Sequence, residues 1–122
     1  MEKEKFNELM RRRTKQLSIR IIQWYKKLPK SDEISIIGRQ LIRSSTSTAA
    51  NYRAVCRARS KAEFFSKLCI VVEEADETVF WLELLQEAGL VPQSLLDELP
   101  PLWQEATEVL AIVATARKNT RR

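Results

Sequence analysis

The chain has 122 residues, of which 44% are hydrophobic and 30% are charged, and its formal net charge at pH 7 is +5. This length suits one domain around a single core, and the scarcity of glycine (2) and proline (4) favours long helices. The start, MEKEKF, is charged, and no apolar run approaches the roughly 20 residues of a membrane span, so we expect neither a signal peptide nor a transmembrane helix. We therefore expect a cytoplasmic protein without membrane contact.

The positive charge is concentrated in the first half of the chain. Residues 1–67 hold 17 Lys and Arg against 6 Asp and Glu, a net charge of +11, whereas residues 68–122 hold 4 against 10, a net charge of −6. A basic surface is typical of proteins that bind nucleic acid. Such a division also lets parts of one bundle, or copies of it, attract each other.

Apolar residues three or four positions apart predict a first helix over residues 3–28, which Pro29 ends because a residue before proline disfavours the helical conformation. Ser31 and Asp32 then cap a second helix over residues 33–58. The small hydroxyl residues from Ser44 to Thr48 indicate either a tight helix–helix crossing within a continuous helix, which we favour, or a local break. The residues expected to face the core are Phe6, Leu9, Met10, Leu17, Ile21, Trp24 and Leu28 in the first helix and Ile34, Ile37, Leu41, Thr48, Tyr52 and Val55 in the second.

Ser60 and Glu63 have the spacing of a capping box and predict the start of a third helix over residues 61–88, which Gly89 ends. A fourth helix is predicted over residues 94–118, where Pro100-Pro101 either starts the helix late, after a short turn, or kinks it early. The short connections predict one all-α domain, residues 1–122, with an antiparallel up-down-up-down four-helix bundle. The expected core residues are Phe64, Leu68, Val71, Val72, Ala75, Val79 and Leu82 in the third helix and Leu102, Ala106, Val109, Leu110, Val113 and Ala116 in the fourth.

Two groups of basic residues are candidates for nucleic-acid binding. On the second helix, four arginines project within roughly 80° of one another, opposite the core face, and could engage successive phosphates. A cluster on the first helix forms a second basic patch. The alternative is that both groups are solvated, or that they pair with carboxylates elsewhere in the assembly. The candidates are Arg39, Arg43, Arg53 and Arg57 in the stripe and Arg11, Arg12, Arg13 and Lys15 in the cluster.

The third helix is apolar on a second side as well as on its core face. A small four-helix bundle buries only one broad face of each helix, and large exposed apolar patches with aromatic residues usually mark interfaces. We therefore predict self-association through this helix, with its carboxylates meeting basic groups of a neighbour; the alternative is that these are ordinary surface residues. The candidates are Ile70, Glu73, Glu77, Phe80, Trp81 and Leu84.

Nothing in the chain indicates a catalytic site. It contains no histidine, no glycine-rich phosphate loop and no G-x-S-x-G motif. The carboxylates from Glu73 to Glu77 could be imagined as metal ligands, but di-iron bundles combine glutamate with histidine on facing helices. Cys56 and Cys69 lie in helical segments without metal-ligand spacing and are expected to be reduced. We expect a protein that is not an enzyme and has no metal or other cofactor.

The segments RQL (39–41), ANYR (50–53), CRARSKAEF (56–64), EEADE (73–77) and WLELL (81–85) resemble a known family. It comprises bacterial four-helix-bundle proteins first noticed in intervening sequences of 23S ribosomal RNA genes, and the resemblance covers about residues 16–115. It implies a left-handed antiparallel bundle that forms a ring-like homopentamer, without established catalytic residues. A more distant similarity is to the accessory variability determinant of diversity-generating retroelements, which binds nucleic acid and a reverse transcriptase through a basic surface.

Two hypotheses about function follow. In the first, a homo-oligomer binds the RNA or DNA backbone through its basic surface. In the second, the protein is an assembly scaffold whose basic and acidic surfaces pair between subunits or with a protein partner, without any role for nucleic acid.

Overall fold

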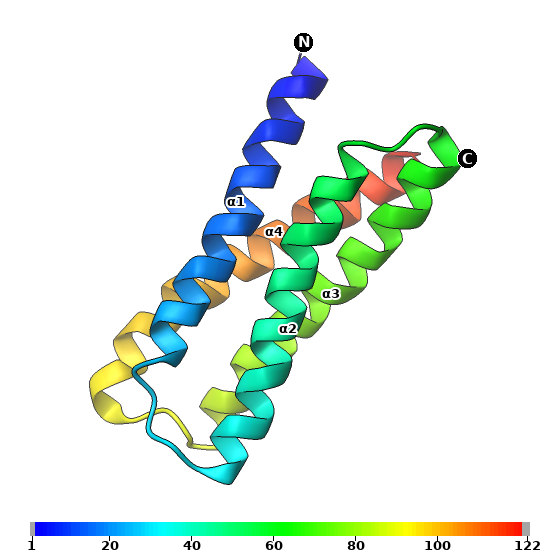
Figure 1. Cartoon of the computed structure of the whole chain (residues 1–122). Coiled ribbons are helices and arrows are strands. Elements are labelled where there is room, and N and C mark those ends of the chain that lie inside the picture. Colours follow the sequence, from blue (N-terminus) through cyan, green and yellow to red (C-terminus); the bar gives the residue numbers. More distant parts are fainter. Residues whose placement is uncertain (1, 121–122) are drawn as a thin grey trace.

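The computed structural model describes residues 2–120. It contains the helices α1 (Glu2–Tyr25), α2 (Asp32–Val55), α3 (Lys61–Glu87) and α4 (Leu99–Thr120), with a short 3-10 helix, η1 (Gln93–Glu98), before α4. Neighbouring helices run antiparallel, and α1 packs against both α2 and α4 while α3 packs against α2 and α4 (Figure 1). The all-α four-helix bundle expected from the sequence is confirmed. No helix within these residues is long and apolar enough to cross a membrane.

The helix ends are set by the local signals that the sequence contains. The hydroxyl of Ser31 accepts a hydrogen bond from the Ile34 N–H at 3.1 Å, as predicted, and that of Ser60 accepts one from the Glu63 N–H at 3.0 Å, so both serines cap their helices. The capping box is only half formed, because the Glu63 carboxylate accepts from the Arg59 N–H, at 3.1 Å, instead of the Ser60 N–H. Arg59 directly precedes the capping residue Ser60, so the Glu63 carboxylate bonds to a backbone N–H one residue earlier in the chain than predicted.

Gly89 ends the third helix as expected, with a φ of +70° that glycine adopts without steric cost. Its N–H bonds to the Gln86 carbonyl at 3.0 Å, and the Leu90 N–H bonds to the Leu85 carbonyl at 3.1 Å. These two bonds form a Schellman motif, which satisfies carbonyl groups that the end of a helix leaves free.

Three predicted helix boundaries differ from those of the structure by three residues or more. The first and second helices end three residues earlier than expected, because the chain tightens into turns with bonds such as Leu28 N–H to the Tyr25 carbonyl and Ala58 N–H to the Val55 carbonyl, both three residues apart. The fourth helix begins at Leu99 instead of residue 94, after η1. Pro100 and Pro101 therefore start this helix late and do not kink it, since a first turn needs no N–H donors there.

The core runs the length of the bundle and contains a polar layer at its middle. The predicted tight crossing in a continuous α2 is confirmed, because Ser44, Ser45 and Thr48 are buried within the helix. The Ser18 hydroxyl donates to the Ser45 carbonyl at 2.8 Å, and the Thr78 hydroxyl donates to the Ser44 hydroxyl at 3.0 Å. Small side chains thus bring α1 and α3 close to α2, and the hydroxyl bonds offset the cost of burying polar groups.

Most predicted core positions are buried, but two in the first helix are not. Phe6 is 38% exposed and Leu9 is 45% exposed. Both lie in the first turns of α1, which extend past the neighbouring helices (Figure 1). They belong to the same helical pattern as the buried Met10 and Leu17, so the expectation that they face the core was wrong for lack of a neighbour to cover them.

Candidate nucleic-acid interface

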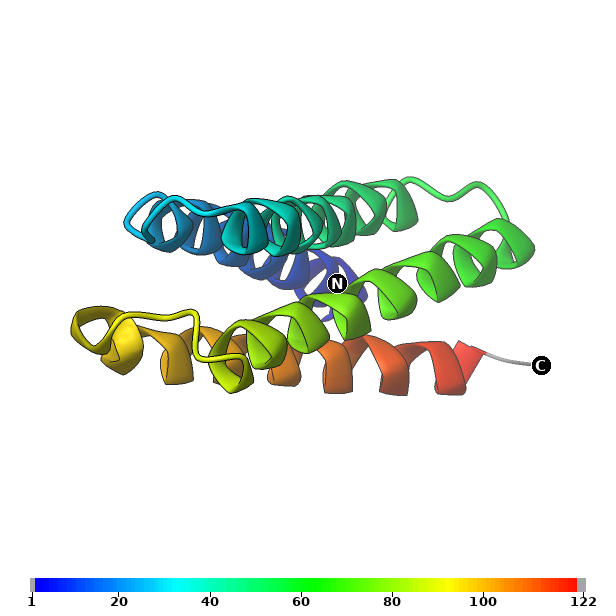
Figure 2. The same cartoon turned by 90° about the horizontal axis from the view of Figure 1, so that it is seen from below.

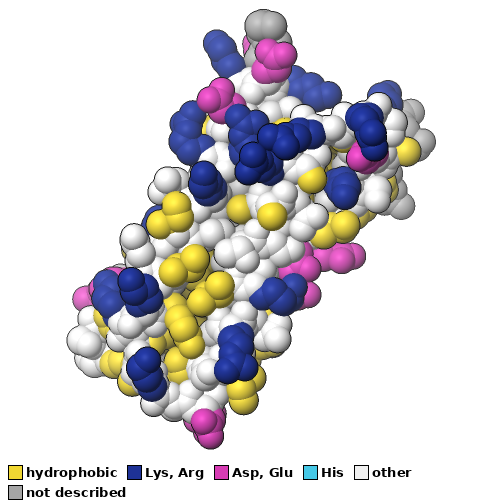
Figure 3. Space-filling model, viewed as in Figure 1, with side chains coloured by type: hydrophobic (Ala, Val, Ile, Leu, Met, Phe, Trp, Pro, Cys, Tyr) yellow, Lys and Arg dark blue, Asp and Glu magenta, His cyan; other side chains and the backbone are white. Residues whose placement is uncertain are grey.

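Five basic residues from α1, from the end of α2 and from the turn that follows α2 line one groove on the surface. They are Arg11, Arg12, Lys15, Arg53 and Arg57, and we call this surface the basic groove. The groove has a volume of about 510 Å³, and its one acidic lining residue is Glu8. Figure 3 shows Lys and Arg side chains gathered over the adjoining parts of α1 and α2. Two separate groups of basic residues in the sequence therefore form a single surface.

Helix geometry and one interhelical contact position these side chains. Arg53 lies in the last turn of α2, whereas Arg57, expected within the second helix, lies in the turn that follows Val55. The buried Tyr52 beside them donates its hydroxyl to the Asn7 side chain of α1 at 3.1 Å. That bond fixes the end of α2 against the first turns of α1, which brings Arg53 and Arg57 next to the cluster that begins at Arg11.

Little negative charge compensates the basic groove. Glu8 approaches Arg12 at 3.9 Å, but both side chains are more than 60% exposed, so this pair contributes little. Within residues 2–120, no carboxylate lies within ion-pair distance of Arg11, Lys15, Arg53 or Arg57. The groove thus presents four cations to solvent without a counter-ion.

Two weakly acidic groups border the groove and stay neutral at pH 7. Burial raises the pKa of the Tyr52 hydroxyl, and the nearby Cys56 raises it further while Arg11 opposes the shift. Burial likewise raises the pKa of the Cys56 thiol, against the opposing effect of Arg11. Neither group supplies an anion, so the Arg, Lys and Glu side chains set the charge of the groove.

The other three predicted nucleic-acid residues lie outside the groove. Arg43 forms ion pairs with Glu77 at 2.7 Å and Glu74 at 3.3 Å, and so connects α2 to α3. Arg39 is exposed, and its side chain donates one hydrogen bond within residues 2–120, to the Ser35 hydroxyl at 3.4 Å. It precedes Arg53 by 14 residues, or about 21 Å along the helix axis. Of the four arginines in the predicted stripe, Arg43 is therefore ion-paired, whereas Arg39, Arg53 and Arg57 have no carboxylate partner within residues 2–120.

Arg13 connects α1 to α4. Its guanidinium bonds to both oxygens of Glu105, at 2.8 and 2.7 Å, and to Glu108 at 3.0 Å. The Glu105 hydrogen bonds raise the Arg13 pKa well above its ordinary value, although burial opposes the shift. With its side chain only 24% exposed, Arg13 is a structural ion pair that has little capacity left for an external phosphate.

The predicted interface residues of the third helix fall into two groups. Ile70, Glu73, Glu77, Phe80 and Leu84 follow one side of α3 at spacings of three and four, and we call them the α3 outer stripe. Phe80 is 51% exposed and Ile70 37%. Trp81 instead packs partly against the core, edge-on to Phe80 with ring centroids 4.8 Å apart. Its buried indole N–H has no hydrogen-bond partner among the described residues.

The sequence analysis missed Glu8 and Asn7 as parts of this region. Glu8 lies four residues before Arg12, a spacing that signals an ion pair on one helical face and was available in the sequence. Asn7 gave no such signal, because only the packing of α1 on α2 brings it to Tyr52. Among residues 2–120, no group of three Cys, Asp or Glu side chains is arranged to hold a metal ion.

Comparison with known proteins shows to which family the chain is related. The family model described as 23S rRNA-intervening sequence protein matches residues 7–112. The chain belongs to this family. Its fold is similar to the crystal structure of a protein of unknown function from the S23 ribosomal protein family of Bacteroides thetaiotaomicron VPI-5482, with a TM-score of 0.79 and 28% identity over 92% of this chain and 97% of that one. No individually curated protein matches the chain.

Family membership confirms the resemblance read from the sequence motifs and agrees with the helical bundle. The matched region contains all five residues of the basic groove and the whole α3 outer stripe. The structural relative carries no assigned function. Any activity of this chain therefore has to be argued from its own surfaces.

Proposed function

We propose that this family member is a non-enzymatic homo-oligomer that binds the RNA or DNA backbone through the basic groove. The observation that carries the proposal is the gathering of five cations from α1, α2 and the turn after α2 around one hollow with a single carboxylate. Placing unpaired cations together costs free energy through their mutual repulsion, and an anionic ligand relieves that cost. For the number of subunits, the family resemblance implies five.

The chemistry of the groove favours phosphates over bases. Arginine presents a planar fork of N–H donors that matches a phosphate group, and Arg11, Arg12, Arg53 and Arg57 supply four such forks. Residues that read base edges are typically Asn, Gln or Arg placed in a duplex groove, and the lining here contains neither of the amides. We therefore expect binding with little sequence preference and with a strong dependence on salt.

A second function is favoured by the α3 outer stripe. Its exposed aromatic ring and its carboxylates suit a protein interface, and Arg43 shows that basic groups of this chain do pair with α3 carboxylates. In this case the protein is an assembly scaffold without a nucleic-acid ligand.

Sedimentation velocity with a labelled 30-nucleotide RNA separates the two functions. The informative variant is Arg53→Glu/Arg57→Glu, and the matched control is Arg39→Glu, which reverses an exposed arginine of the same helix outside the groove. We expect RNA to co-sediment with the wild type and the control at 50 mM salt but not with the double variant, whose oligomer stays intact. If no RNA co-sediments with the wild type at low salt, the nucleic-acid function fails. If the oligomer of the double variant dissociates as well as losing RNA, the result favours the scaffold function.

A further inference from the structure

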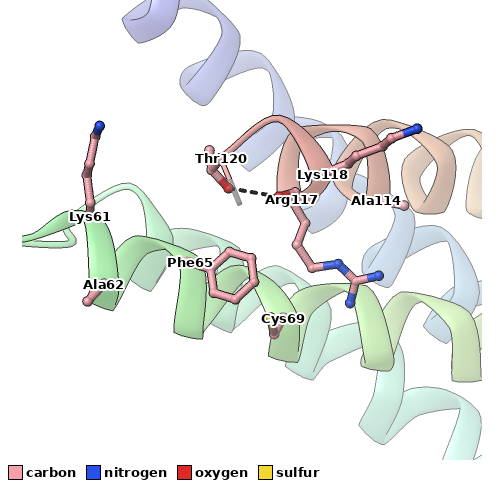
Figure 4. Close-up of a pocket in the computed structure, with 8 residues that line it drawn as sticks. All are labelled: Lys61, Ala62, Phe65, Cys69, Ala114, Arg117, Lys118 and Thr120. Carbon is pink, nitrogen blue, oxygen red and sulfur yellow. Dashed lines mark hydrogen bonds between the residues drawn. The ribbon is translucent and has the colours of Figure 1, made fainter. Parts of the chain in front are cut away.

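A second hollow lies on the other side of the molecule, between the start of α3 and the end of α4. Figure 2 shows these two helices diverging toward that end. The hollow measures about 1080 Å³, and we call it the α3–α4 cleft (Figure 4). Its lining residues are Lys61, Ala62, Phe65, Cys69, Ala114, Arg117, Lys118 and Thr120.

The cleft combines an apolar floor with a basic rim. Phe65, Cys69 and the small Ala62 and Ala114 form the floor, because alanine side chains are too short to fill the space between the diverging helices. The side chain of Arg117 extends from α4 toward α3 (Figure 4). Over residues 2–120, no carboxylate forms an ion pair with the three cations of the rim, Lys61, Arg117 and Lys118.

The same chain carries a surface of opposite character. The α3 outer stripe places the exposed Phe80 and Ile70 beside Glu73, which is exposed and forms no ion pair within residues 2–120. An apolar ridge with an unpaired carboxylate matches an apolar floor with cations, both in polarity and in charge. The two surfaces cannot meet within one chain, because both belong in part to the single continuous helix α3 (residues 61–87).

We propose that the α3 outer stripe of one copy docks into the α3–α4 cleft of a second copy. Phe80 enters the apolar floor, and the unpaired Glu73 of the stripe forms an ion pair with Arg117 or Lys118, whereas Glu77 keeps its partner Arg43. This inference rests on the homo-oligomer of the proposed function and names the surfaces that build it. The contact joins two different surfaces, so it is heterologous: it leaves one free stripe and one free cleft on every pair, and repeats until a ring closes or a filament grows.

Mixing two inactivated subunits tests the proposal directly. Arg117→Glu disables the cleft and leaves the stripe intact, whereas Phe80→Asp disables the stripe and leaves the cleft intact. Each variant alone should be monomeric by sedimentation velocity at micromolar concentration. An equimolar mixture should form a 1:1 heterodimer and nothing larger, because one intact stripe and one intact cleft remain.

Controls keep the result interpretable. Circular dichroism checks that both variants keep the helix content of the wild type, and Glu73→Lys serves as a second stripe variant that leaves the contact between Phe80 and Trp81 in place. Lys26→Glu and Leu9→Asp make matched changes at exposed positions away from both surfaces and should leave the oligomer unchanged.

Three results would overturn the proposal. The Arg117→Glu variant could assemble like the wild type, which would fit an isologous stripe-to-stripe contact instead. The mixture could remain monomeric. The wild type could itself be monomeric. If the monomer then binds the amphiphilic anion 8-anilinonaphthalene-1-sulfonate and the Arg117→Glu variant does not, the cleft is a binding site for a small anion. None of these variants changes a residue of the basic groove, so RNA binding is measured separately. If the wild type binds no RNA, the proposed function fails but the proposed interface between copies does not.

Discussion

The ion pairing of Arg43 and the lack of a partner for Arg53 predict opposite phenotypes for two alanine substitutions in α2. Arg43→Ala removes the cation that faces Glu77 at 2.7 Å and Glu74 at 3.3 Å. Arg53→Ala removes a cation that has no carboxylate partner within residues 2–120. Arg43→Ala should lower stability and leave RNA affinity nearly unchanged. Arg53→Ala should lower RNA affinity and leave stability nearly unchanged.

The magnitude follows from the burial of the partners. The Glu77 side chain is 45% exposed, so its pair with Arg43 contributes only a few tenths of a kcal/mol, up to about 1. Glu74 is 16% exposed and its Oε1 atom is buried; the 3.3 Å contact with Arg43 is not aligned as a hydrogen bond, so the guanidinium charge is its main compensation. Leaving that oxygen without the cation costs about 1 kcal/mol more. Together, Arg43→Ala should lower the free energy of unfolding by about 1–2 kcal/mol and Tm by about 4–8 °C.

Urea unfolding and RNA fluorescence anisotropy, measured on the same preparations, check this prediction. Adding Glu74→Gln to the Arg43→Ala variant should restore part of the lost stability, because it removes the uncompensated charge. The reasoning is refuted if Arg43→Ala weakens RNA binding as much as Arg53→Ala does while its urea midpoint stays at the wild-type value.

Three further predictions concern packing and reactivity. Gly38→Ala should destabilise the protein by about 1–2 kcal/mol, because the added Cβ would overlap the Tyr25 ring. In a Tyr25→Ala background the same change should stabilise the protein by up to about 1 kcal/mol, because alanine has the higher helix propensity. Thermal unfolding of the wild type, the two single variants and the double variant measures both changes in stability. Arg13→Ala should cost about 1–2 kcal/mol in urea unfolding by removing the bidentate pair with Glu105, without changing RNA affinity. Because burial raises the pKa of Cys56, iodoacetamide at pH 8 should alkylate it more slowly in the native protein than in urea, and equal rates would contradict that cause.

Local signals in the sequence predict most of this fold. The serines at positions 31 and 60 and Gly89 mark helix ends through bonds to residues three to five positions away, which the sequence places close together in any context. Apolar periodicity likewise identifies the buried sides of all four helices. The exposure of Phe6 could not be predicted in this way, because it depends on whether another helix covers the first turns of α1.

The candidate site shows the same limit more clearly. Periodicity groups Arg39, Arg43, Arg53 and Arg57 on one side of α2, but it does not reveal which of them meets a carboxylate from another helix. The ion pairs of Arg43 with α3 and of Arg13 with α4 span 31 to 95 positions of sequence and form only after the bundle does. The joining of Arg53 and Arg57 with the α1 cluster depends in the same way on the pairing of α1 with α2.

The salt dependence of RNA binding tests the role of the basic groove most directly. If the four unpaired cations each neutralise one phosphate of a single strand, log affinity should fall against log salt concentration with a slope of about −2.8, roughly a 50-fold loss between 50 and 200 mM. Arg53→Ala/Arg57→Ala should halve that slope to about −1.4, and Arg39→Ala should leave it unchanged. An affinity that ignores salt, or the same slope in the wild type and the double variant, would contradict the account.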